Sequence, residues 1–216
     1  IVATAAPSST FILLGFLDAA DVLAKVSANG IQVVAGMFIE LAWALAVVGI
    51  IVVLLPVLKK HNASLALGFF GLRLMEAISV LVGTIVLMTL LALSQEYAGA
   101  VARSASHYRT AGTLLLAARD WAFRLGSGFV FSLSAVILNW LLYQSRLIPR
   151  WLSGWGLVGA ALSFATYLLQ VFGISLDILF LPIALQEMVF AVWLIVKGFN
   201  PSAIAAGYAG SDAARA

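Results

Sequence analysis

Residues Ile31 to Leu58 read IQVVAGMFIELAWALAVVGIIVVLLPVL, and this stretch decides the fold. It is longer than the roughly 20 apolar residues that an α-helix needs to cross a bilayer. A membrane β-barrel would instead show alternating segments of about 10 residues, and no such alternation is present here. The stretch therefore predicts a transmembrane helix.

The rest of the chain has the same character. Hydrophobic residues make up 63% of the sequence and charged residues 10%, against roughly 25% charged residues in soluble proteins. We predict an all-α fold, a bundle of six transmembrane helices in a single domain over residues 1–200. The remaining residues, 201–216, are small and polar, and we expect a flexible tail there. The predicted helices cover residues 1–17, 31–58, 64–93, 121–143, 151–172 and 176–196.

The first of these segments is too short to span a bilayer comfortably, since about 20 residues are needed. The sequence also begins without a methionine, inside an apolar stretch. We therefore expect that the first helix is truncated in this sequence.

Loop charges predict the orientation. Three connections carry only basic residues, and such loops lie on the cytoplasmic side of a membrane. With six helices, both termini are then cytoplasmic. The basic residues are Lys59, Lys60, Arg146, Arg150 and Lys197.

Several function classes find no support in the composition. The chain has no cysteine, which excludes disulfides, thiolate metal sites and cysteine nucleophiles. His61 and His107 fall in separate loops, so no metal site or haem ligand is predicted. No basic run is present that would bind nucleic acid. We predict no cofactor, and an enzyme is disfavoured because no nucleophile constellation is visible.

Ionisable residues inside the predicted spans are the main functional candidates. Glu40, Arg73, Glu76 and Glu187 each fall near the bilayer midplane, where a charge costs several kcal/mol unless it is paired or neutralised. Gln186 adds an amide at the same level. If the four charges gather, one or two glutamates should be protonated, because burial and like charge both favour the neutral acid. The cluster is either a structural lock between helices or a proton or ion site.

A second group of charges lies where the fourth predicted helix enters from the outer side. Arg119 and Asp120 can reach the interface there, while Arg124 lies a turn deeper and needs a partner, either Asp120 or Glu96. We interpret these residues as an interfacial ion-pair cluster, or as the mouth of a site for anionic ligands.

Glycines recur within the predicted helices. Such positions allow helix backbones to approach closely in a membrane. We interpret them as packing positions, and they include Gly68, Gly71, Gly126, Gly128, Gly154, Gly156 and Gly159.

Five short motifs stand out, and they are LALSQEY at 91–97, LLAARDWAF at 115–123, SRLIPRWLSGWG at 145–156, PIALQEM at 182–188 and WLIVKGF at 193–199. Together they resemble the motifs of one bacterial family, DUF4386, whose members are multi-spanning membrane proteins. The resemblance runs from about Leu17 to Ser202. It implies a six-helix protein of the bacterial inner membrane, and it implies no activity.

Two functional classes follow. The first is a non-enzymatic structural or accessory subunit, embedded in the lipid bilayer within a larger membrane complex or a homo-oligomer. The second is a small proton- or ion-linked transporter or sensor that uses the Glu/Arg cluster.

Overall fold

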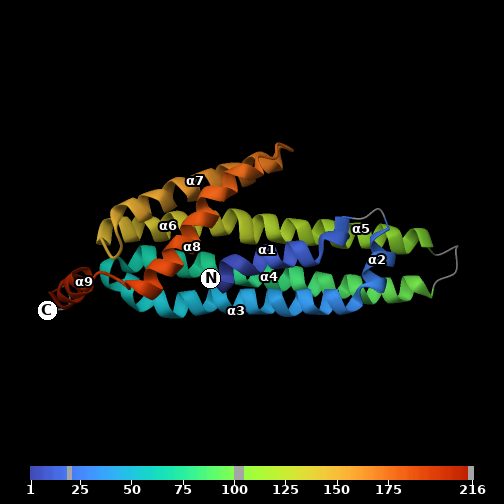
Figure 1. The fold of residues 1–216 in the computed structure, drawn as a ribbon, viewed down its shortest axis with the longest axis horizontal. Helices are drawn as coiled ribbons and strands as arrows, with labels where there is room; N and C mark the ends of the chain where they lie inside the picture. The colour runs from blue at the N-terminus through green and yellow to red at the C-terminus, as the bar shows by residue number, and fades with distance from the viewer. Residues whose placement is uncertain (19–20, 100–104, 214–216) are drawn as a thin grey trace. The chain divides into compact units, whose positions relative to one another are not determined.

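The computed structural model describes residues 1–18, 21–99 and 105–213. These residues are predominantly helical and include no strand, which confirms the all-α prediction (Figure 1). The elements are α1 (Val2–Leu13), η1 (Gly15–Asp18), α2 (Val22–Ala28), α3 (Gly30–His61), α4 (Ala63–Ala98), α5 (Ala105–Ala122), η2 (Phe123–Val130), α6 (Phe131–Ser145), α7 (Arg150–Val171), η3 (Asp177–Phe180), α8 (Leu181–Val196) and α9 (Pro201–Ala213).

Among the described residues, five helical stretches are long and apolar enough to cross a membrane, which is the pattern of a multi-pass membrane protein. Their bounds lie close to those of the predicted segments, except that the third stretch begins at Ser106 and not at Trp121. The stretches are Gly30–His61, Ala63–Ala98, Ser106–Ser145, Arg150–Val171 and Asp177–Val196.

The first predicted segment is not among these five. Residues 1–17 form α1, which has 12 residues, followed by the short 3-10 helix η1. By its rise of about 1.5 Å per residue, α1 is too short to cross a core of roughly 30 Å. The count of six spanning helices therefore stays a prediction.

The fourth predicted helix begins earlier than expected. We placed its start at Trp121, but α5 begins at Ala105 and continues through the π-helix η2 into α6. Two threonines before Trp121 do not interrupt the helix, because their hydroxyls bond back to its own carbonyls. Thr110 donates to the carbonyl of Ser106 at 3.1 Å, and Thr113 donates to that of Arg109 at 3.0 Å.

The expected tail is helical where the structure describes it, because residues 201–213 form the helix α9. Asn200 provides its start: the Asn200 side-chain oxygen accepts from the backbone N–H of Ser202 at 3.1 Å. Pro201 occupies the first helical position, where its missing N–H costs nothing. The alanines that follow favour a helix. Residues 214–216 lie outside the described part of the chain.

By contacts, the chain divides into two compact units. Unit 1 contains Ile1, Val47–Glu76 and Ser127–Ala216. Unit 2 contains Val2–Ala46 and Ala77–Gly126. Both units draw residues from α3 and α4.

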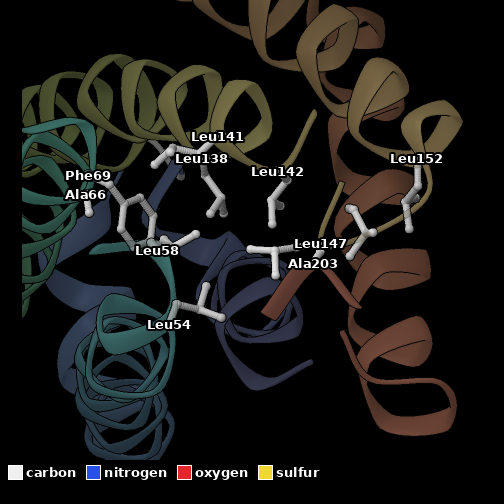
Figure 2. Packing of buried hydrophobic residues seen from close by; sticks show 11 residues of the cluster. Leu54, Leu58, Ala66, Phe69, Leu138, Leu141, Leu142, Leu147, Leu152 and Ala203 are labelled. Atoms are coloured by element: carbon white, nitrogen blue, oxygen red, sulfur yellow. The ribbon is translucent and has the colours of Figure 1, made fainter. Parts of the chain in front are cut away.

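The core of unit 1 is a cluster of leucines around Phe69, which is fully buried on α4. Figure 2 shows Phe69 beside Leu58 of α3, with Leu138 and Leu141 of α6 in the same cluster. Within this unit α7 packs against both α6 and α8. This packing positions α8, which carries Glu187.

The core of unit 2 is smaller and aliphatic. Val26 of α2, Val33 of α3 and Leu87 of α4 are fully buried within it. Gly36 lets Leu14 approach α3, since a β-carbon at Gly36 would lie 2.9 Å from that leucine side chain. This core holds α3 and α4 beside the N-terminal helices.

Candidate functional site

The most deeply buried acid belongs to unit 2. Glu40 on α3 is fully buried and binds Arg119 of α5 through both carboxylate oxygens. Arg119 donates Nη1 to Oε2 at 3.3 Å and Nη2 to Oε1. The hydroxyl of Thr84 on α4 donates to Oε2 at 2.8 Å. The result is a forked ion pair that joins three helices and carries no net formal charge.

Arg119 has further partners that fix its position. Its Nη1 donates to the carbonyl of Gly83 at 2.6 Å, and its guanidinium lies 4.7 Å from the centre of the Phe123 ring. Phe123 in turn stacks on Trp43, with ring centres 5.8 Å apart. A β-carbon at Gly83 would lie 2.6 Å from Phe123, so only glycine leaves room for this arrangement. The guanidinium is therefore held by charge, hydrogen bonds and an aromatic face.

This pairing differs from the predicted cluster, in which Arg73 was the basic residue available to Glu40. Arg119 was assigned to the outer boundary because its helix was expected to begin at Trp121. Since α5 begins at Ala105, Arg119 lies about 20 Å along the helix by its rise per residue. It is 7% exposed. The start of this helix was predicted sixteen residues too late. For that reason Arg119 was not predicted to be the partner of Glu40.

The remaining residues of the predicted outer-mouth cluster have other surroundings. Asp120 and Arg124 form an i,i+4 ion pair at 2.7 Å with both side chains substantially exposed. Glu96 is exposed near the end of α4. Because Arg119 is paired with Glu40, the four residues of the predicted outer-mouth cluster do not form a single cluster.

Unit 1 contains the second buried charge group. Arg73 and Glu76, one turn apart on α4, pair at 2.9 Å, and Arg73 also lies 3.6 Å from Glu187 of α8. Arg73 and Glu76 are 4% and 2% exposed, whereas 23% of the Glu187 side chain is exposed. The structure thus brings these three predicted residues together. With all three ionised, two carboxylates and one guanidinium have a formal charge of −1.

Aromatic rings complete the surroundings of Arg73. Its guanidinium lies 5.0 Å from the ring centre of Phe131 and 5.8 Å from that of Phe69. The Nε of Arg73 is buried without a hydrogen-bond partner. Rings of this kind attract a cation through their negative faces, which compensates part of the cost of burying it.

Gln186 was grouped with these charges because it precedes Glu187. Neighbouring helix residues point about 100° apart, and Gln186 faces different partners. Its side-chain nitrogen donates to Asn139 at 3.3 Å and to the carbonyl of Leu152 at 3.4 Å. Gly156 makes room for this amide pair, because a β-carbon there would overlap Asn139. Gln186 therefore links α8 to α6 and α7 through neutral hydrogen bonds.

Chemically, these sites can hold charge and exchange protons. Within residues 1–18, 21–99 and 105–213, no group of three His, Asp or Glu side chains could hold a metal ion. Of the three glutamates in the two buried charge groups, Glu187 has the most exposed side chain.

Comparison with known sequences supports the resemblance seen in the motifs. A family model described as "Domain of unknown function (DUF4386)" matches residues 1–198. The chain belongs to the DUF4386 family. The region that matches DUF4386 includes both buried charge groups and every candidate membrane span. No curated protein and no solved structure matches the chain.

Proposed function

We propose that this chain is a non-enzymatic structural or accessory membrane protein, packed in or against a larger membrane assembly. The observation that carries this proposal is the internal pairing of Glu40. Both of its oxygens are engaged by Arg119 and Thr84, and the side chain is fully buried. A buried charge used in this way locks helices together rather than waiting for a ligand.

The surface of α8 supports a partner-binding role. In the 18-residue apolar stretch of the span Asp177–Val196, only 11% of the residues are buried inside the protein. Leu181, Val192 and Ile195 are all more than half exposed. Such a face suits either lipid chains or the apolar helix of a neighbouring subunit.

The proposed setting is the bacterial inner membrane, with six crossings and both termini cytoplasmic. Support comes from the basic residues at the ends of three candidate spans, including Lys59, Arg150 and Lys197.

An accessory role predicts stable partners. Extraction of the full chain from its native membrane in a mild detergent should yield a complex with at least one partner chain in a fixed ratio. Size-exclusion chromatography with quantitative mass spectrometry measures that ratio. Recovery of a clean monomer from native membrane would contradict the accessory role.

A second candidate function is proton- or ion-linked transport or sensing at the Arg73 group. It is favoured by the excess acid in that group and by the partial exposure of Glu187. In this case Glu187 would exchange a proton or cation while Arg73 and Glu76 stayed paired.

Glu187→Gln separates the two functions. Under the structural proposal, the full chain in liposomes should show the same proton flux before and after this change. Stability should fall by up to about 1 kcal/mol, because the partly exposed ion pair of Glu187 with Arg73 at 3.6 Å is lost. A pH-sensitive dye inside the liposomes measures the flux, and Glu96→Gln is the exposed control. Proton flux in the wild type that Glu187→Gln abolishes without loss of stability would establish the second function instead.

A further inference from the structure

A pocket of about 560 Å³ lies within unit 1, where two turns meet. One turn joins α6 to α7 and the other joins α8 to α9, and both can be followed in Figure 1. Sites for small molecules typically have volumes of about 300–1,000 Å³. The pocket is therefore large enough for a bound group.

Its lining is strongly basic. Arg146, Arg150 and Lys197 all contribute, and the described residues that line the pocket include no acid. None of these three cations forms an ion pair with a carboxylate in the described part of the chain. All three side chains are exposed, and an anion between them would offset their mutual repulsion.

The pocket is held in shape by its own turns. Leu147 and Ile148 are buried in the core of unit 1, and the backbone N–H of Asn200 donates to the carbonyl of Leu147 at 2.9 Å. Arg146 adopts a left-handed conformation, with φ of 56°, which is uncommon for a residue other than glycine. The backbone beside the cations is thus fixed by buried side chains and by a hydrogen bond between the two turns.

The pocket lies at the ends of candidate membrane spans, the part of a spanning helix that meets lipid head groups. Three candidate spans end at it: Ser106–Ser145, Arg150–Val171 and Asp177–Val196. Trp193, which lines the pocket, packs edge-on against Trp151 with ring centres 6.3 Å apart. Tryptophans concentrate at the boundary between a membrane and water.

We propose that this pocket binds the phosphate group of an anionic lipid head group. Arginine binds phosphate oxygens through parallel hydrogen bonds, and Arg146 and Arg150 bring two such groups to one cavity. Lys197 adds a third positive charge. Trp193 and Phe199 offer an apolar wall for the glycerol and the first methylenes of an acyl chain. Free phosphate shares the same charge chemistry but gains nothing from that wall.

Calorimetric titration of the full chain in a neutral detergent tests this site. The probes are dihexanoylphosphatidylglycerol, dihexanoylphosphatidylcholine and inorganic phosphate at equal ionic strength. We expect the phosphatidylglycerol to bind at least tenfold more tightly than either of the others. Lys197→Gln should weaken that binding about fivefold, because one positive charge near the head group is lost.

Lys59→Gln is the matched control, since Lys59 is an exposed lysine at the end of α3 and does not line the pocket. It should change the affinity less than twofold. Arg146→Gly gives a second test that spares the fold, because glycine adopts the left-handed conformation without strain. It too should weaken phosphatidylglycerol binding several-fold.

Three results would overturn the proposal. Equal affinity for phosphatidylcholine would remove the requirement for an anion. Equal affinity for inorganic phosphate would make this a site for a free anion rather than for a lipid. If Lys59→Gln lowered the affinity for phosphatidylglycerol as much as Lys197→Gln does, the lipid would be attracted to the basic surface in general and not to this pocket.

Discussion

Arg119→Met should lower the free energy of unfolding by about 3–5 kcal/mol, the usual cost of breaking a buried ion pair by removing one partner. The reason is that Glu40 is fully buried and would keep only the hydrogen bond from Thr84. It must then stay charged without a cation or take up a proton, and both carry an energetic cost. Unfolding of the full chain in mixed detergent micelles with increasing dodecyl sulfate measures the change.

Two further variants show whether the loss comes from the unpaired charge. Arg124→Met breaks an exposed pair on the same helical stretch, and we expect a loss below about 1 kcal/mol. The double variant Glu40→Gln, Arg119→Met removes both charges and should recover most of the stability. If the double variant is as unstable as Arg119→Met alone, then contacts of Arg119 with Gly83 and Phe123 dominate, and the ion pair does not.

Gly159→Ala should lower the free energy of unfolding by about 1–3 kcal/mol, the usual cost of overpacking a core. Gly159 is buried on α7 and faces α8. A β-carbon there would lie 2.9 Å from the backbone nitrogen of Ile183 and 3.0 Å from its Cα. These are backbone atoms, so no side-chain rotation relieves the clash and the two helices must separate. Helix association in a membrane depends on such close packing, since lipid is as apolar as the core.

Gly154→Ala is the control on the same helix. A β-carbon at Gly154 meets no atom within 4 Å, so alanine adds no clash. Alanine favours a helix over glycine by up to about 1 kcal/mol, and this variant should be neutral or slightly more stable. The same micelle unfolding measures both. Equal effects of the two alanines would mean that packing against Ile183 does not hold α7 to α8.

Much of the helical framework could be predicted from the sequence. The spans that became α3, α4, α7 and α8 were evident because each is a long apolar run closed by charges, proline or glycine. The start of α5 was missed because polarity alone was used to place it. Its threonines satisfy their hydroxyls within the helix and do not end it.

The contacts between charges were harder to predict. Arg73 and Glu76 could be paired from their spacing alone, since residues three apart share a helix face. The pairing of Glu40 with Arg119 depends on which faces of α3 and α5 meet. Both faces of α3 are apolar, so the sequence pattern does not reveal the orientation of the helix. Gly83 was not singled out either, although its missing side chain admits the ring of Phe123.

The long separation of Glu40 and Arg119 sets an order of events during synthesis. The two residues are 79 positions apart, so at about 5–20 residues per second the ribosome adds the arginine roughly 4–16 s after the glutamate. Arg73 and Glu76, by contrast, leave the ribosome within a second of each other and can neutralise one another inside a single nascent helix. The charge on α3 can therefore be matched only after α5 has been made, so this first long helix depends on a much later part of the chain for its burial.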